Sequence, residues 1–310
     1  MTPRGAHAVE VMAQAKVNLR LKILAREASG FHQLETLFLR LDLSDRVRVR
    51  RTTGARSLDV GGDVDLAQIG SAENNLAWRA ADAYLQAAGG SGGFAIEIEK
   101  RIPIGGGLGG GSADAGAVLR ALDAMSESPL GDVALMSMAA RLGADVPFLT
   151  GHSAYVLAWG RGERMVALPA PERRAVLLVL PQVAVNTAAA YGWLADARAA
   201  AGTESGCAVF ATDISQLSDW DSLAALAEND FEPVVALRHS EVGRIAGSLR
   251  ASGAFSVAMM SGSGSAVFAV ERSAAGEFSI SMKAKDPAVT PPRQLRTFTA
   301  TSVEQISVIE

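Results

Sequence analysis

The sequence predicts an α+β fold, because segments of strand character and segments of helix character follow one another in no regular order. Residues 9–24 and 31–51 alternate apolar and polar side chains, as half-buried strands do. Residues 73–89 instead repeat apolar side chains at helical spacing and end at a glycine pair. A doubly wound protein would alternate single strands with single helices, and this sequence does not.

The rest of the first half adds one strand, two helices and a hairpin. Residues 93–104 alternate again, and a glycine-rich stretch then leads into a helix with an apolar stripe over residues 115–125. Asp132 is predicted to cap the next helix, which ends at Gly143, and a hairpin is predicted around residues 160–162.

Two prolines and a charge cluster over residues 168–174 predict the boundary between a first domain, residues 1–168, and a second domain, residues 169–310. The second domain is predicted to contain three helices, from residue 187, over 222–227 and over 240–253, and three strands, over 175–180, 256–260 and 265–270. Its tail, residues 271–310, is predicted to form an exposed loop over residues 283–296 before a final short strand. The role of the tail stays open.

Composition limits the classes of function. The 310 residues carry a formal net charge of -4, which argues against a general nucleic-acid binder, because phosphate contacts need a basic surplus. The single cysteine, Cys207, rules out an internal disulfide and fits a reducing compartment. The start lacks a secretory signal, and the longest apolar run, residues 175–185, is too short to span a bilayer. We therefore expect a cytoplasmic protein with no nucleic-acid or membrane partner, either a monomer or a weak homodimer.

Residues 101–122 contain the most informative pattern. Six of the seven residues from 105 to 111 are glycine, and a serine and an apolar helix follow. Gly105, Gly107 and Gly110 match the dinucleotide-binding pattern G-x-G-x-x-G, but the strand before them alternates, whereas a central parallel strand is apolar on both faces. A Walker A loop also fails, because no Gly-Lys-Ser/Thr follows, and a flexible linker would mix glycine with polar residues.

A phosphate-binding loop agrees best with this stretch. Glycines let backbone N–H groups turn toward a ligand, and Ser112 stands where the N-cap of the helix is expected, so the positive end of the helix faces the same place. The Ser112 hydroxyl can cap the helix or reach a phosphate oxygen or Mg²⁺. No cluster of histidine, cysteine and carboxylates has the spacing of a zinc site, and no G-x-S-x-G motif indicates a hydrolase.

Three motifs resemble those of the GHMP kinases, the superfamily of galactokinase, homoserine kinase, mevalonate kinase and phosphomevalonate kinase. "PIGGGLGGGSADAG" resembles their second motif, and "AKVNLRL" and "MSGSGSAVFAV" resemble the first and third, in the same order along the chain. The resemblance implies a two-domain fold with ATP and substrate in the cleft between the domains. It also implies a mixed α/β N-terminal domain with a left-handed βαβ-type nucleotide site and a ferredoxin-like α/β sandwich as the C-terminal domain.

One branch of this superfamily is more similar than the others. The segments "GFHQLETLF", "LGADVPFL", "VNTAAAY" and "NDFE", together with the three motifs, resemble the kinases that act on 4-diphosphocytidyl-2-C-methyl-D-erythritol, over about residues 13–270. That branch belongs to the non-mevalonate route to isoprenoids. The resemblance implies a small-molecule substrate, ATP and Mg²⁺ as cofactors, and transfer of the γ-phosphoryl group to the 2-hydroxyl of the methylerythritol unit.

Two residues are implied to be catalytic. Asp145 matches the family's general base, and Lys16 matches the lysine beside it, which favours the ionised carboxylate. Because Gly143 ends a helix and Pro147 biases Val146 toward an extended conformation, we expect Asp145 to lie on a rigid corner. Without the resemblance, the sequence would predict that Asp145 is an ordinary aspartate in a turn and that Lys16 is a lysine facing solvent.

The substrate site is implied by the remaining matches. Phe31 stands where the family usually has tyrosine, so it can stack on cytosine but has no hydroxyl to donate; how this affects affinity stays open. His32 would pair with the edge of the cytosine, and Tyr191 would close over its other face. Asn18 shares a strand face with Lys16. Further substrate contacts are implied for Thr187, Gly262, Ser263 and Gly264.

The ATP site is implied to surround the glycine-rich stretch. Its predicted residues are Asn75, Lys100, Pro103, Gly105, Gly106, Gly107, Gly109, Gly110, Gly111 and Ser112, and Ser112 is also the candidate Mg²⁺ ligand. Asp114 is expected to complement the helix dipole. Asn229 and Asp230, in "NDFE", are expected to have structural roles.

Three other functions compete with this prediction. A kinase of the same fold could act on homoserine or mevalonate, but it would not need the aromatic residues expected around cytosine. A non-catalytic nucleotide-binding relative should have lost Lys16 or Asp145, and both are present. An NAD-dependent dehydrogenase is disfavoured by the alternating strand before the glycines.

Overall fold

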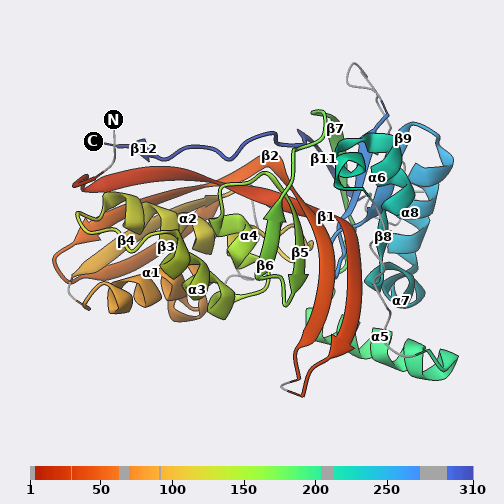
Figure 1. The fold of residues 1–310 in the computed structure, drawn as a ribbon, viewed down its shortest axis with the longest axis horizontal. Helices are drawn as coiled ribbons and strands as arrows, with labels where there is room; N and C mark the ends of the chain where they lie inside the picture. The colour runs from red at the N-terminus through yellow and green to blue at the C-terminus, as the bar shows by residue number, and fades with distance from the viewer. Residues whose placement is uncertain are drawn as a thin grey trace.

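The computed structural model describes residues 4–28, 30–62, 70–90, 92–203, 213–272 and 292–309. Two sheets organise these residues, one of eight strands and one of four. Figure 1 shows two long strands, β1 (Ala8–Arg26) and β2 (His32–Thr52), that cross the molecule and then bend downward as a hairpin. The mixture of sheets and helices confirms the α+β prediction.

The first sheet has the order β12-β1-β2-β4-β3. β1 and β2 are antiparallel, with register shifts after Gln14, Asn18 and Ile23 that let the hairpin bend. β3 (Arg56–Gly62) and β4 (Gly93–Lys100) are parallel and are joined through α1 (Leu76–Ala87), which makes a βαβ unit. A one-turn 3-10 helix, Ala72–Asn74, precedes α1.

Further strands extend this sheet, and helices cover it. β5 (Tyr155–Gly160) pairs with β2, and β6 (Arg164–Ala167) pairs with β5. Apolar side chains of α1, of α2 (Gly110–Met125) and of α3 (Asp132–Leu142) join those of β1, β2 and β4 in one buried cluster. A short helix, α4 (Val146–Thr150), packs against α2.

The second sheet has the order β11-β7-β10-β9, with every pair antiparallel. Its strands are β7 (Ala175–Leu180), β9 (Phe255–Met260), β10 (Val267–Glu271) and β11 (Arg293–Phe298). Alternate residues of β9 and β10 join different apolar clusters, so both faces of this sheet are buried. One cluster includes side chains of α5 (Thr187–Ala201), α7 (Phe231–Arg238) and α8 (Ser240–Ala251), and the other includes those of the 3-10 helix Ile214–Ser218 and α6 (Trp220–Leu226).

The chain crosses between its two halves more than once. β8 (Glu228–Asn229) pairs in parallel with β1, and β12 (Ser307–Val308) pairs antiparallel with β1. The larger apolar cluster contains both Val11 of the first sheet and Phe268 of the second. Strands from the second half of the chain thus complete the first sheet. The domain boundary at residue 168 stays a prediction.

Most predicted elements are confirmed, and four details are wrong. Gly109, with φ 76°, holds the N-cap position of α2, so Ser112 lies inside the first turn. Gly131 holds the N-cap position of α3, and Asp132 is its first helical residue. Val146 is helical rather than extended, since Pro147 is tolerated in a first turn. Residues 293–296, predicted as loop, belong to β11. Cys207 and residues 283–291 lie outside the described residues.

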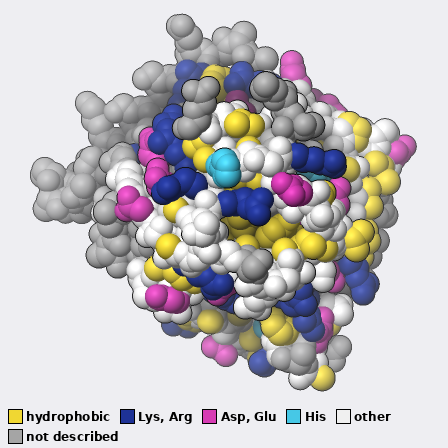
Figure 2. Space-filling view, turned by 90° about the vertical axis from the view of Figure 1, so that its left-hand side faces the viewer, with side chains coloured by type: hydrophobic (Ala, Val, Ile, Leu, Met, Phe, Trp, Pro, Cys, Tyr) yellow, Lys and Arg dark blue, Asp and Glu magenta, His cyan; other side chains and the backbone are white. Residues whose placement is uncertain are grey.

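Surface charge is mixed on the face turned toward the reader in Figure 2, where basic and acidic side chains both occur across the described surface. Two of the ion pairs on the first sheet join Arg46 to Glu99 and Arg48 to Glu10. Within the described ranges, every helix is too short or too polar to cross a membrane.

Candidate active site

The glycine-rich loop joins β4 to α2 and closely approaches two other parts of the chain. Gly105, Gly107 and Gly109 all have φ near +75°, a conformation that favours glycine. A β carbon on Gly107 would lie 2.2 Å from the carbonyl oxygen of Ser261, and one on Gly109 would lie 2.9 Å from Cγ of Lys16. The fold itself therefore requires glycine at these two positions.

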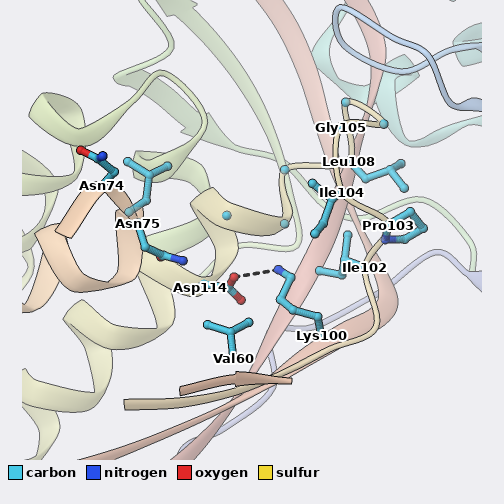
Figure 3. Close-up of a pocket in the computed structure, with 16 residues that line it drawn as sticks. Val60, Asn74, Asn75, Lys100, Ile102, Pro103, Ile104, Gly105, Leu108 and Asp114 are labelled. Atoms are coloured by element: carbon cyan, nitrogen blue, oxygen red, sulfur yellow. Dashed lines mark hydrogen bonds and ion pairs between the residues drawn. The ribbon is translucent and has the colours of Figure 1, made fainter. Parts of the chain in front are cut away.

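A cavity of about 240 Å³ opens beside this loop. Its wall includes the apolar side chains of Val60, Leu76, Ile102 and Ile104, and Figure 3 shows Asn75 projecting toward the cavity from the start of α1. The Asn75 side chain also caps α1, because its Oδ1 accepts a hydrogen bond from the Ala77 N–H at 2.9 Å. Apart from Ser112, every residue predicted for ATP lines this cavity: Asn75, Lys100, Pro103, Gly105, Gly106, Gly107, Gly109, Gly110 and Gly111.

Lys100 lies at the bottom of this cavity within a buried charge cluster. Its Nζ donates to Oδ2 of Asp114 at 2.7 Å and to Oδ2 of Asp45 (Figure 3 shows the bond to Asp114). Oδ1 of Asp45 accepts from the backbone N–H groups of Arg101 and Ile102, whereas Oδ1 of Asp114 is buried without a partner. Burial raises the pKa of Asp114 to about 7, against the opposing effect of Lys100.

These contacts change two expectations about charged side chains. Asp114 does not merely complement the helix dipole, because it is a partner of Lys100 in the second turn of α2. Lys100 lines the cavity, but its ammonium group is already paired with two carboxylates. Asp45 was not predicted as part of this region. Its only sequence signal is its place in a Ser-Asp pair within a long strand pattern, which many strands share.

A second cavity, of about 290 Å³, also borders the glycine loop. Gly105 and Gly107 line both cavities, so the two meet at the loop. Most residues predicted for catalysis and substrate binding line the second cavity: Lys16, Asn18, Asp145, Thr187, Tyr191, Gly262, Ser263 and Gly264. Ser112 also lines it, at the start of α2.

The centre of this second cavity is an ion pair. Nζ of Lys16 lies 3.1 Å from Oδ2 of Asp145, and the side chains are 3% and 31% exposed. Nζ of Lys16 also donates to Oδ1 of Asn18 at 2.8 Å, and Nδ2 of Asn18 donates to the Thr36 hydroxyl at 2.8 Å. Thr36 in turn donates to the carbonyl oxygen of Arg20. This chain of hydrogen bonds fixes the position of the Lys16 ammonium group. Thr36 was not predicted as a site residue, because threonine is common in strands and its presence there does not indicate a function.

The third glycine motif closes the cavity from the second half of the chain. Gly262 and Gly264 have φ values of 56° and 97°. The hydroxyls of Ser263 and Thr187 share a hydrogen bond of 2.8 Å, which joins this turn to the start of α5. A β carbon on Gly262 would lie 3.4 Å from Nζ of Lys16, so the turn lies against the ion pair.

Of the three residues expected around cytosine, the structure brings His32 and Tyr191 together but not Phe31. The rings of His32 and Tyr191 are stacked, with centroids 4.4 Å apart, and Tyr191 also meets the edge of Phe231. Phe31 is 57% exposed and its ring lies against the guanidinium of Arg161, away from the cavity wall. Burial and the nearby charges of two arginines lower the pKa of His32, which favours the neutral imidazole.

Comparisons with known proteins agree with this geometry. A family model described as the GHMP kinases N terminal domain matches residues 75–153, and one described as the GHMP kinases C terminal matches residues 210–280. The crystal structure of a homoserine kinase from Cytophaga hutchinsonii superposes with a TM-score of 0.65 at 19% identity, over 98% of each chain, which shows a shared fold. Fold and site thus define a kinase of the GHMP class, and the predicted GHMP fold is confirmed.

Relatives with higher sequence identity indicate one family within this class. Proteins named 4-diphosphocytidyl-2-C-methyl-D-erythritol kinase from Desulfitobacterium hafniense (strain Y51) and Geobacter sp. (strain M21) are each 38% identical to this chain over 84% of its length and 87% and 88% of theirs. A crystal structure of 4-(cytidine 5'-diphospho)-2C-methyl-D-erythritol kinase superposes with a TM-score of 0.69 at 32% identity, over 94% of this chain and 98% of that one. The chain belongs to the 4-diphosphocytidyl-2-C-methyl-D-erythritol kinase family.

Proposed function

We propose that this kinase transfers the γ-phosphoryl group of ATP to the 2-hydroxyl of 4-diphosphocytidyl-2-C-methyl-D-erythritol, in the methylerythritol phosphate route to isoprenoids. The observation that carries this proposal is the ion pair of Lys16 and Asp145 in a cavity that meets the first cavity at Gly105 and Gly107. A donor and an acceptor placed in these two cavities would react beside the glycine loop.

Asp145 is the proposed general base. Its partly exposed carboxylate accepts the proton of the attacking hydroxyl, while the substrate oxygen forms a bond to the γ-phosphorus and the bond to the bridging oxygen of ADP breaks. Lys16, held by Asn18, orients the carboxylate through the ion pair and stabilises the negative charge that develops on the attacking oxygen.

ATP is proposed to occupy the first cavity, with its base among the apolar side chains near Asn75 and Pro103 and its phosphates along Gly105–Ser112. The backbone N–H groups at the start of α2 favour negative charge there. Mg²⁺, when bound, would neutralise charge on the phosphates. The Ser112 hydroxyl lines the second cavity and is the side chain we propose as its protein ligand.

The cytidyl group is proposed to bind beside Tyr191. The neutral form of His32 can both donate and accept hydrogen bonds at a cytosine edge, which its lowered pKa supports. Phe31 would have to rotate away from Arg161 to stack on the base. Asn18, Thr187 and the turn of Gly262, Ser263 and Gly264 line the space left for the rest of the substrate. We propose a cytoplasmic enzyme that acts on these small molecules, either as a monomer or as a weak homodimer.

The test is turnover with defined substrates. Purified protein with Mg-ATP and 4-diphosphocytidyl-2-C-methyl-D-erythritol should release ADP, and the phosphorylated product should appear in equal amount. Turnover with homoserine or mevalonate but not with this compound would reject the substrate and leave the fold and nucleotide site intact.

Replacing the base is the sharpest test of the mechanism. Asp145→Asn should lower kcat by about 10²-fold or more, because a positioned base contributes that much, while ATP affinity stays within about threefold. Asp132→Asn is a matched control, since Asp132 is exposed and its ion-pair partner is His152. Activity that survives in Asp145→Asn would assign the proton transfer to another group.

A further inference from the structure

Asn229 makes an unusually complete set of hydrogen bonds beside the turn of Gly262, Ser263 and Gly264. Its side-chain Nδ2 donates to the carbonyl oxygens of Met260 and Gly262, both at 2.8 Å, and its Oδ1 accepts from the Phe231 N–H at 2.9 Å. The residue is 6% exposed. Both amide protons are thus used on two carbonyl groups that flank Ser261.

The backbone of Asn229 is tied to the strand that carries Lys16. Asn229 ends β8, and in the parallel pairing of β8 with β1 it lies opposite Leu21. The next residue, Asp230, continues this attachment, because its N–H donates to the Leu21 carbonyl and its carboxylate accepts from the Ile23 N–H. Asn229 therefore links β1 to the third glycine motif.

The other side of that motif is fastened to the phosphate loop. The Ser261 hydroxyl donates to the Gly107 carbonyl at 3.0 Å, and the Ala266 N–H donates to the Gly106 carbonyl at 3.2 Å. Because a β carbon on Gly107 would collide with Ser261, this contact is also sterically close. The turn is held between two anchors, the glycine loop on one side and Asn229 on the other.

We infer that Asn229 is a positioning residue, which sets where the turn of Gly262, Ser263 and Gly264 lies relative to Lys16 and the phosphate loop during phosphoryl transfer. This inference rests on the proposed function and assigns a role in turnover to a residue expected to be only structural. A displacement of about 1 Å in such a site can cost about 10²-fold in rate, even when the displaced group does no chemistry.

The chemistry of the amide explains why this position is specific. An aspartate has the same shape and can still accept from the Phe231 N–H, but it has no N–H to donate. Its second oxygen would face the carbonyl oxygens of Met260 and Gly262, which would repel it. Asn229→Asp should therefore displace the turn while leaving β8 paired with β1.

The experiment compares Asn229→Asp with Asp230→Asn. Asp230 is the next residue; it is partly buried, and its carboxylate pairs with Lys22 on β1 and Arg198 on α5 rather than with the turn. We expect Asn229→Asp to lower kcat by about 10-fold to 100-fold with the KM for ATP within about threefold, because the first cavity is intact. Asp230→Asn should lower the melting temperature with kcat within about twofold of wild type. If Asn229→Asp does not fold, Asn229→Ser replaces it in the comparison. Serine keeps one hydrogen-bond donor, and this variant should lower kcat about 10-fold.

Two outcomes would overturn the inference. One is a soluble Asn229 variant with wild-type kcat, which would mean that Asn229 only supports stability. The other is an equal loss of kcat in Asp230→Asn, which would mean that any destabilising change near β8 lowers turnover. All variants are measured on the alcohol that the wild type phosphorylates. Wild-type inactivity on 4-diphosphocytidyl-2-C-methyl-D-erythritol would reject the proposed function without touching this comparison.

Discussion

The cluster of Lys100, Asp45 and Asp114 shows what burial does to single side chains. All three residues are at most 5% exposed, and two carboxylates share one ammonium group. Asp45 is the better satisfied carboxylate, because two backbone N–H groups also donate to it. Asp114 has a buried oxygen with no partner, so its charged form is the less favoured of the two.

The raised pKa of Asp114 predicts a pH-dependent stability. The carboxyl group has a pKa of about 7 in the folded chain and an ordinary value of 3.8, so the folded state holds a proton that the unfolded state has lost between about pH 4 and 7. Its contribution to stability is therefore present at low pH and is lost as the pH rises through this window. Lys100, whose pKa is raised from 10.5, titrates outside it.

Asp114→Asn removes this titration. From pH 5.5 to 7.5, the free energy of unfolding of the variant should rise relative to wild type by roughly 1–2 kcal/mol. Urea unfolding of both proteins at the two pH values measures this difference. A constant difference would mean that Asp114 stays ionised, and would contradict the assignment of the proton.

At the scale of elements, the glycine loop contains glycines that are needed for different reasons. Gly107 and Gly109 are required by contacts within the protein and by their positive φ. Gly111 lies in the first turn of α2, and a β carbon there would meet nothing closer than Cδ1 of Leu76 at 3.9 Å. The fold alone does not explain glycine at this position, but the close approach of a ligand would.

Gly111→Ala separates these two causes. Because alanine has the better helix propensity, the variant should be as stable as wild type or more stable by up to about 1 kcal/mol. Its affinity for ATP should nevertheless fall by about 10-fold, since the methyl group occupies ligand space. Thermal melting and equilibrium nucleotide binding test both parts. Gly107→Ala is the contrasting control and should lose stability, and unchanged ATP affinity in Gly111→Ala would place the phosphates elsewhere.

The elements also show how far the sequence could be used for prediction. Long periodic segments such as α1 and β7 are found from local patterns alone. β3, α4 and α7 were not predicted, because a seven-residue strand with two terminal glycines and short helices give weak periodicity. Motif matches located Lys16 and Asp145, which lie 3.1 Å apart, whereas Thr36 and Asp45 are recognisable only from contacts that link distant segments.

For the whole molecule, the two halves of the chain are joined because both contribute strands to the first sheet and side chains to one apolar cluster. β1 receives β8 and β12 from the second half of the chain, and Ala300 donates a backbone hydrogen bond to Arg40. The carbonyl groups that hold the buried Arg40 guanidinium belong to Phe148, Gly151 and Ser153. A cut at residue 168 would remove partners from both the edge of the first sheet and its core.

This joining predicts one cooperative unfolding transition. Trp78 lies on α1 beside the first sheet, and Trp193 lies on α5 beside the second. In variants that retain only one of these tryptophans, the others being replaced by Phe, the fluorescence midpoint should coincide with that of far-ultraviolet circular dichroism on the same variant. Calorimetric and van't Hoff enthalpies of the wild type should agree for the same reason. If the Trp193 reporter melts first while the dichroism changes in two steps, the halves fold independently and residue 168 marks a true domain boundary.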